Sequence, residues 1–215
     1  MTQNTRKIAV LTGDLVNSTG LGPVKIERAF AALEDCAATQ AEWMGESLHF
    51  TRHRGDGWQV ALAEPKYALR SALAFRAALR AQGEEFDSYI GIAEGEVEGE
   101  IGPDLNEETD EVFVWSGLAL ETTKSLKDGI TRMFYLDNRT KAAATILADS
   151  LARRWSTAQA QALTQVISPL KRQTLTEIGE HLGKSRQAVA KSLDAANYIS
   201  ISTALSVIEG KSINA

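Results

Sequence analysis

The sequence contains few of the residues that mark specialised classes of protein. Of its 215 residues one is cysteine, Cys36, and four are proline. A single cysteine excludes an internal disulfide, a cysteine-rich zinc module and a CxxC redox motif. No run of 18 apolar residues is present, and the N-terminus leads into a short apolar strand without a signal-peptide region. With 44% hydrophobic and 24% charged residues, the composition is that of an ordinary globular protein. We therefore expect a soluble, cytoplasmic protein that does not bind membranes.

The charges are unevenly distributed along the chain. The net charge is -5, but residues 1–138 carry 13 basic and 23 acidic side chains, whereas residues 139–215 carry 10 and 5. Such a split suggests that the two parts meet different partners, and a basic C-terminal part suits a nucleic acid. Attraction between the two parts explains the same split equally well.

Residues 1–138 alternate between strand-like and helix-like segments. Short β-branched or alternating runs predict strands at 7–16, 47–54, 57–63, 88–97 and 131–136. Helical spacing of apolar residues predicts helices at 24–43, 65–81 and 112–127. Asp56-Gly57 is a strong hairpin signal between the second and third strands. This order predicts an α/β (α+β) domain whose sheet is mixed, because a hairpin cannot belong to a purely parallel sheet.

The composition changes after residue 137, and the last third of the chain contains no convincing strand. Residues 139–154 and 157–167 read as helices, and Ser168-Pro169 then interrupts the helical pattern. We therefore predict an α/β domain over 1–138, a helical connector over 139–168 and a small all-α domain over 169–215.

Two aspartates are expected at one edge of the predicted sheet. Asp14 ends the first strand and Asp56 occupies the hairpin, so both carboxylates meet if these elements are neighbours. Two carboxylates and a backbone carbonyl from Leu15 or Val16 are a typical oxygen set for Mg²⁺ bound with a nucleoside triphosphate. The simpler alternative is that Asp56 is only a turn residue and that Asp14 only caps the turn.

The most specific local pattern is in the C-terminal domain, at residues 175–193. Thr176 is placed to cap a short helix, Gly183 to end it in the left-handed conformation, and Ser185 to cap a second helix. This spacing resembles the helix-turn-helix of bacterial transcription factors. In that geometry Arg186 and Gln187 face base edges in the major groove. The phosphate contacts are assigned to Lys184, Ser185 and Lys191. A packing or protein-interaction role is the alternative.

Motifs in the first half resemble a known family. GDLVNST (13–19) and RGDGWQVALAEPKYALRSAL (54–73) resemble class III nucleotidyl cyclase domains, and YIGIAEGEV (89–97) is similar to a later cyclase strand. Together with the helix-turn-helix, the arrangement more closely resembles the SatD family of bacterial proteins. GDGWQ (55–59) and SGLALETTKSLK (116–127) are similar to two motifs of that family.

The resemblance implies a ferredoxin-like, class III cyclase-like mixed sheet followed by a small helix-turn-helix domain. It implies that Asp14 and Asp56 bind Mg²⁺ or Mn²⁺. The nucleotide-binding residues that it implies are Leu15, Asn17, Ser18, Thr19, Arg52 and Gly55. The cyclase Asn and Arg that serve ribose and transition-state phosphate are missing from 112–127, where Trp115, Ser116, Gly117 and Ala119 stand. Loss of one such donor commonly costs about 3 kcal/mol of transition-state stabilisation or more.

These patterns are compatible with three functions. The favoured one is a homodimeric DNA-binding transcriptional regulator whose cyclase-like domain binds a nucleotide with Mg²⁺ or serves dimerisation. The alternative is an active nucleotidyl cyclase that makes a cyclic mononucleotide, and the third is a scaffold. The missing Asn and Arg favour the first over the second, and the basic C-terminal part favours it over the third.

Overall fold

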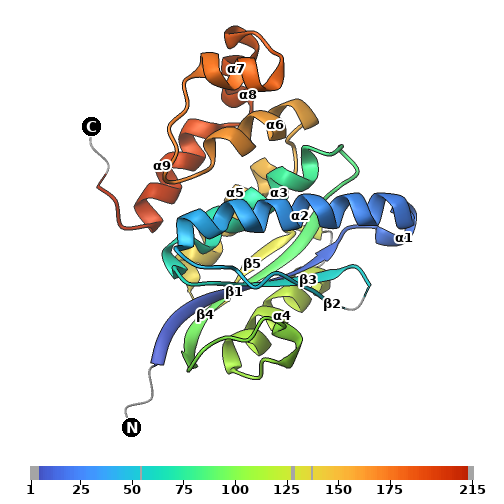
Figure 1. The fold of residues 1–215 in the computed structure, drawn as a ribbon, viewed down its shortest axis with the longest axis vertical. Helices are drawn as coiled ribbons and strands as arrows, with labels where there is room; N and C mark the ends of the chain where they lie inside the picture. The colour runs from blue at the N-terminus through green and yellow to red at the C-terminus, as the bar shows by residue number, and fades with distance from the viewer. Residues whose placement is uncertain (1–4, 54, 127–128, 137, 213–215) are drawn as a thin grey trace.

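The computed structural model describes residues 5–53, 55–126, 129–136 and 138–212. A five-stranded sheet lies at the centre of the N-terminal half, in the order β2-β3-β1-β4-β5 (Figure 1). Its strands are β1 (Thr5–Leu15), β2 (Thr51–His53), β3 (Gly57–Leu62), β4 (Ser88–Glu98) and β5 (Met133–Tyr135). The predicted mixed α+β class is confirmed, because β1 pairs antiparallel with β3 and β4, whereas β4 and β5 are parallel.

The central strand β1 sorts its side chains to the two faces of the sheet. Ala9 and Leu11 belong to the larger apolar core, whereas Ile8 and Val10 belong to a smaller one on the other face. This separation follows from the period of two in a strand. Both faces are covered, which explains why the segment reads as a continuous apolar run rather than an alternating one.

Helices cover the two faces unequally. The larger core lies under α2 (Pro23–Met44) and α3 (Ala68–Arg80), which follows the short 3₁₀ helix η1 (Pro65–Tyr67). The opposite face carries α4 (Glu111–Ser125), preceded by the 3₁₀ helix η2 (Leu105–Glu107). In Figure 1, α2 and α4 lie on opposite sides of the sheet.

The contact between α4 and the sheet depends on a glycine. A Cβ added to Gly91 on β4 would lie 2.2 Å from the carbonyl oxygen of Ser116 and from the amide of Leu120. Only a residue without a side chain lets the α4 backbone approach this closely.

Most expected elements occur, with shifted ends. The strand predicted at 47–54 is limited to β2, and His49 just before it adopts a left-handed conformation at φ 48°. A short helix, α1 (Ser18–Leu21), forms within the predicted turn after β1. Residues 54, 127, 128 and 137, on which parts of the hairpin, the third helix and the domain boundary were predicted, lie outside the described residues.

Helix α3 is buried on nearly all sides, although it contains three arginines. Arg70 pairs with Glu209 and Arg76 with Asp87 and Asp149, while the Arg80 Nε donates to the Trp155 carbonyl at 2.7 Å. Most of these partners belong to the C-terminal part of the chain. The helix is therefore enclosed between the sheet and the helices that follow.

The C-terminal part is helical throughout the described residues 138–212. It consists of α5 (Arg139–Ala152), α6 (Thr157–Val166), α7 (Leu175–Leu182), α8 (Arg186–Ala195) and α9 (Tyr198–Ile208). Buried residues of these helices, including Leu163, Val189 and Leu205, join the same apolar cluster as the α2–α3 core. The division into domains stays a prediction, and any C-terminal unit would have this packed boundary with α3.

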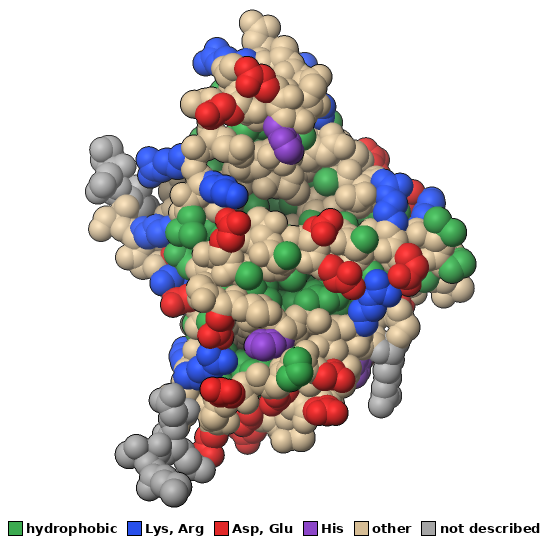
Figure 2. Space-filling view, in the orientation of Figure 1, with side chains coloured by type: hydrophobic (Ala, Val, Ile, Leu, Met, Phe, Trp, Pro, Cys, Tyr) green, Lys and Arg blue, Asp and Glu red, His purple; other side chains and the backbone are tan. Residues whose placement is uncertain are grey.

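Some of the basic side chains in the C-terminal part form ion pairs with acidic side chains in the N-terminal part. Lys141 pairs with Glu94 on β4, and Lys171 pairs with Glu42 at 3.4 Å, so basic residues of the second part contact acidic residues of the first. Acidic side chains gather at the lower end of the face in Figure 2, below the sheet. None of the described helices is long and apolar enough to cross a membrane.

Candidate functional site

The structure brings the two predicted aspartates together. Asp14, near the end of β1, is opposite Gly57 at the start of β3, and the Leu15 amide donates to the Asp56 carbonyl at 3.1 Å. The side chains of Asp14 and Asp56 lie side by side. We refer to these two residues as the carboxylate pair. Their meeting follows from the pairing of β1 with β3, which places a strand end beside the hairpin.

The segment after β1 folds back onto the carboxylate pair. Asn17 takes a left-handed conformation at φ 53°, which short polar side chains tolerate, and starts the single turn of α1. This turn brings Ser18 back, so that its hydroxyl donates to an Asp56 carboxylate oxygen. Of the predicted nucleotide-binding residues, Ser18 thus touches the pair directly.

The pKa of Asp14 is raised above its ordinary value, because Lys124 offsets only part of the effect of burial and of the neighbouring Asp56. Burial raises the pKa of Asp14, and the neighbouring Asp56 raises it further, although Lys124 opposes both effects. Two acids that share one site disfavour the doubly charged form. A bound cation would relieve this repulsion.

Sequence reasoning missed Lys124, on the last turn of α4. Its Nζ lies 2.7 Å from Asp14 Oδ2 and 3.6 Å from Glu121 Oε1. The contact with Asp14 raises the pKa of Lys124 in spite of partial burial. No spacing rule joins residues 110 positions apart, so only the packing of α4 on the sheet could identify this partner.

A polar row continues from the carboxylate pair along the same face of the sheet. Thr12 lies two residues before Asp14, so it faces the same way. Its hydroxyl hydrogen-bonds the Ser116 hydroxyl at 2.6 Å and accepts from Gln59 Nε2 at 2.8 Å. Ser116 therefore anchors α4 to β1, and this bond helps to set the position of Lys124, about two turns further along the helix.

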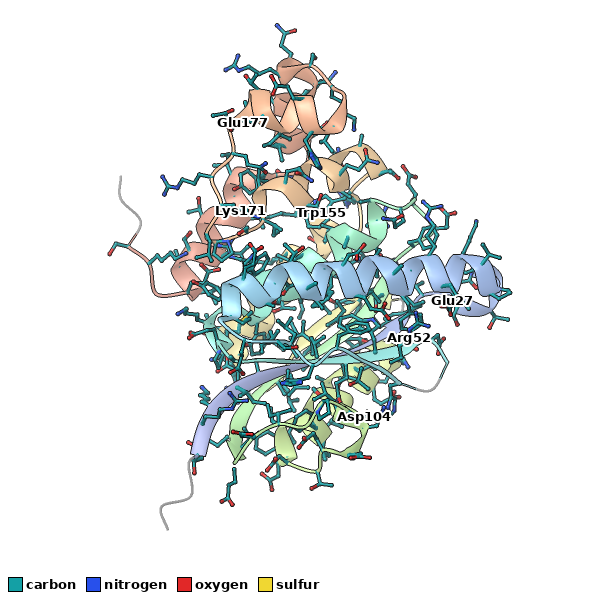
Figure 3. The ribbon with its side chains drawn as sticks, in the orientation of Figure 1. Glu27, Arg52, Asp104, Trp155, Lys171 and Glu177 are labelled. Carbon is teal, nitrogen blue, oxygen red and sulfur yellow. The ribbon has the colours of Figure 1, made fainter. Side chains whose placement is uncertain are left out.

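Arg52, predicted to bind nucleotide, lies on the opposite face of the sheet. It pairs across the strands with Trp58, which packs in the α2–α3 core, and its guanidinium contacts Glu27 and Glu34 at 3.0 and 3.2 Å. Figure 3 shows Arg52 next to Glu27. Arg52 was predicted to lie in the nucleotide site with Asp14. Side chains alternate between the two faces of β2, so a side chain opposite the core residue Trp58 cannot reach Asp14.

The other predicted residues near the pair contribute backbone rather than side chains. Leu15 is buried in the α2–α3 core, and its amide holds the hairpin. Gly55 turns the hairpin at φ 84°, a conformation that favours glycine. Thr19 is exposed on α1.

A buried charge cluster lies close to the carboxylate pair, and its members were not singled out from the sequence. Arg76 binds Asp87 with two hydrogen bonds of 2.8 and 2.7 Å and also contacts Asp149. Arg132 Nη1 donates to Asp87 at 2.6 Å. The backbone of Asp87 accepts from the Val16 amide at 2.9 Å, which joins the cluster to the end of β1. These four side chains, Arg76, Asp87, Arg132 and Asp149, form the buried charge cluster.

The helices α7 and α8 are joined by the predicted tight turn. Gly183 is left-handed at φ 63°, and Ser185 caps α8 by accepting from the Ala188 amide at 3.2 Å. A Cβ on Gly179 would lie 2.6 Å from the Lys184 carbonyl, which explains the small residue there. The cap of α7 was wrongly assigned, since Thr174, not Thr176, accepts from the Glu177 amide at 3.3 Å. Glu177 completes a capping box by accepting from the Thr174 amide, a signature visible in the sequence.

The residues predicted to contact DNA are accessible, with one exception. Arg186, Gln187 and Lys191 are exposed along α8, and Ser185 is exposed at its start. Lys184 is half-buried, and its Nζ donates to Gln161 Oε1 at 2.9 Å on α6. The structure uses Lys184 to attach the turn to α6, which leaves its ammonium less available to a phosphate.

In the described parts of the chain no group of three or more His, Cys, Asp or Glu side chains forms a metal cage. The carboxylate pair therefore supplies two of the ligands that a cation needs, with Ser18 as a neutral oxygen beside them. This set is too small for a structural metal centre. It fits Mg²⁺, which is commonly held by one or two carboxylates together with waters and substrate phosphates.

No family model matches the sequence. No curated protein matches it either. Among solved structures, a bacterial light-regulated adenylyl cyclase is similar at 14% identity with a TM-score of 0.43, over 68% of this chain and 46% of that one. The chain thus spans about half the length of that cyclase. The guanylyl cyclase Cya2 is similar at 19% identity with a TM-score of 0.44, over 68% of this chain and 81% of that one. Neither likeness assigns a residue or a reaction to this chain.

Proposed function

We propose that this chain binds a nucleoside triphosphate together with Mg²⁺ or Mn²⁺ at the carboxylate pair. The observation that carries the proposal is the meeting of Asp14 and Asp56 at the end of β1, with Ser18 beside them and, among the described residues, Lys124 as the cation in contact with Asp14. A divalent cation matches this charge and these oxygen donors. When bound, it would neutralise part of the phosphate charge.

The chain's own residues favour binding over cyclisation. The α4 region where cyclases carry Asn and Arg holds Trp115, Ser116, Gly117 and Ala119, and Ser116 and Ala119 are fully buried. None of these residues can place a positive charge against a developing phosphate charge. Lys124 is the cation that α4 places at Asp14 instead. We therefore keep cyclic mononucleotide synthesis as the alternative to be tested.

Titration calorimetry with ATP, GTP, CTP and UTP in Mg²⁺ tests the proposal. Asp56→Asn should weaken binding by about tenfold or more, as expected when a metal site loses a ligand. Asp35→Asn, at an exposed position on α2, is the matched control and should bind as the wild type does. Equal binding heats in wild type and Asp56→Asn would remove the site.

Turnover is measured separately. The protein is incubated with each triphosphate plus Mg²⁺ or Mn²⁺, and mass spectrometry searches for a cyclic mononucleotide. A cyclic product that disappears in Asp56→Asn would establish the enzyme. Binding without product would leave the nucleotide as an effector.

A second candidate function, DNA binding by α8, rests on a different observation. The helix starts directly after a three-residue turn, and Arg186, Gln187 and Lys191 are exposed along it. Arg pairs best with guanine and Gln with adenine in the major groove. Residues 174–197 carry three basic and three acidic side chains, so affinity would depend on directed contacts more than on net charge.

Gel-shift selection on a random DNA library tests this function. Arg186→Ala should relax the preferred sequence, whereas Arg154→Ala, an exposed position at the end of α5, should not. With two phosphate-facing cations per chain, Lys184 and Lys191, the logarithmic salt slope should be about -2. Absence of any selected sequence would refute DNA reading.

Two half-sites require two copies of the chain, so we extend the DNA proposal to a homodimer. Light scattering coupled to size-exclusion chromatography measures this state, and a monomer at all concentrations would oppose it.

A further inference from the structure

The carboxylate pair already holds a cation, and it is part of the chain. Lys124 Nζ contacts Asp14 Oδ2 at 2.7 Å, a distance typical of a strong charge-assisted hydrogen bond. Asp56 contributes a second negative charge beside this contact. The ammonium therefore lies where a divalent cation would find its best ligand.

Lys124 is held less tightly than Arg76 of the buried charge cluster, whose side chain is fully buried. Its side chain is 35% exposed, and it comes from the last turn of α4 on a flexible four-carbon chain. A second partner, Glu121 Oε1, is 3.6 Å from its Nζ on the same helix. The ammonium can therefore leave Asp14 without losing every negative partner.

An ammonium on Asp14 Oδ2 and a divalent cation on the same carboxylate repel each other. This repulsion between like charges is stronger near a protein surface than in bulk water. Binding of the cation therefore favours release of Lys124 from Asp14. The displaced ammonium stays next to the site, where a triphosphate would bring several negative oxygens.

We propose that Lys124 is a displaceable counter-ion of Asp14 that excludes the free cation and then binds the phosphates of the incoming nucleotide. The inference rests on the proposed function of the carboxylate pair and concerns how that site is regulated. It predicts that cation and triphosphate bind cooperatively. Free Mg²⁺ competes with Lys124, whereas the cation–nucleotide complex offers the ammonium a new partner. Lys124 is in this view a binding and positioning residue.

Electron paramagnetic resonance of Mn²⁺ measures cation binding without any turnover. Lys124→Gln removes the competing charge and should bind Mn²⁺ alone roughly threefold to tenfold more tightly than the wild type. The same variant should bind the Mn²⁺–ATP complex roughly tenfold more weakly. These opposite signs distinguish a counter-ion from a residue that only supports the fold.

Two further variants complete the test. Lys124→Arg keeps the charge and should restore weak Mn²⁺ binding, and Lys66→Gln removes an exposed lysine on η1 and should change neither affinity. If Lys124→Gln binds Mn²⁺ no better than the wild type while Asp56→Asn loses it, the inference is wrong but the cation site remains. If wild type, Asp56→Asn and Lys124→Gln all fail to bind Mn²⁺, the proposed function itself falls. Melting curves of all variants show whether each is folded.

Discussion

Two clusters of charged side chains lie near the end of β1, and they differ in how well their positive and negative charges match. In the buried charge cluster, Arg76 and Arg132 face Asp87 and Asp149, and the Arg76, Asp87 and Asp149 side chains are at most 2% exposed. In the carboxylate pair, Lys124 contacts Asp14, whose side chain is 22% exposed. Among the described residues, the first group has two arginines for two aspartates and is largely buried, whereas the second has two aspartates with one lysine in contact and is partly exposed.

The pKa shifts of the two groups have opposite signs. Burial alone would raise the pKa of Asp87, but the charge and hydrogen bonds of Arg76 outweigh it and hold the pKa below its usual range. Burial raises the pKa of Asp14, and Lys124 does not fully compensate. This difference supports our proposals that the cluster stabilises the fold and that the carboxylate pair binds a ligand.

Breaking the buried charge cluster should have the largest effect. Arg76→Met leaves Asp87 and Asp149 without their main partner, and such uncompensated buried charges cost about 3–5 kcal/mol of unfolding free energy. Urea denaturation measures the loss. Arg154→Met, at an exposed position, is the control and should stay within about 0.5 kcal/mol of the wild type. A loss as small as that of the control would show that the cluster does not hold α3 to α5.

Disturbing the contact between α4 and the sheet should have the next largest effect. Gly91→Ala places a methyl group against the α4 backbone and should cost about 1–3 kcal/mol or more. It should also move Lys124, while the buried charge cluster stays in place, because that cluster comes from α3, α5 and the segments just before β4 and β5. Gly117→Ala on α4 meets no atom within 4 Å and should stabilise the helix by about 0.5–1 kcal/mol. Denaturation curves that rank these two variants the other way would contradict the packing described above.

Removing one acid from the carboxylate pair should hardly affect stability. Asp14→Asn loses the contact with Lys124 but also the repulsion from Asp56, so the free energy of unfolding at neutral pH should change by no more than about 1 kcal/mol. Cation binding should nevertheless be lost. A destabilisation as large as that of Arg76→Met would mean that the pair is structural after all.

The two groups should respond to acid in opposite directions. Asp87 has a lowered pKa in the folded state, so its stabilising contribution is complete above the unfolded value of about 4 and is lost as the pH falls through the folded pKa. Asp14 has a raised pKa, so the folded state binds its proton first. Its ionisation costs stability as the pH rises from about 4 through the folded pKa.

Unfolding free energies of wild type, Asp14→Asn and Asp87→Asn, measured from about pH 8 down to about pH 2, check these signs, because the Asp87 contribution is lost below about pH 4. The deficit of Asp87→Asn should shrink toward low pH. Any advantage of Asp14→Asn should also vanish there, because protonated wild-type Asp14 is neutral. An Asp14→Asn difference that is constant with pH would show that this carboxyl does not titrate differently on folding.

Much of the fold could be predicted from local patterns. The strand at the N-terminus, the Asp56-Gly57 hairpin, the long helix after Pro23 and the turn at Gly183 all occur, because each depends on residues close in sequence. The meeting of Asp14 with Asp56 was also expected, since a hairpin beside the first strand suffices to bring them together. The cap of α7 was misassigned by two residues, although the Thr174–Glu177 capping box was there to be read.

Long-range partners were not predictable in this way. Arg52 was placed in the nucleotide site on its position in a motif, but the register of β2 turns it toward Glu27 and Glu34 on the other face. No local pattern marks the three arginines of α3 as buried, and their burial depends on polar partners that are distant in the sequence. The contact between Lys124 and Asp14 is another long-range pairing that local patterns do not predict.

By itself, then, the sequence determined which segments are strands and helices and which residue types stand at their ends, because periodicity, glycine and capping side chains act over a few residues. Tertiary structure alone decided which cation each of these acids contacts. Electrostatic pairing depends on distance in space, and the packing of α3, α4 and the C-terminal helices places Arg76 against the buried Asp87 and Lys124 against the partly exposed Asp14.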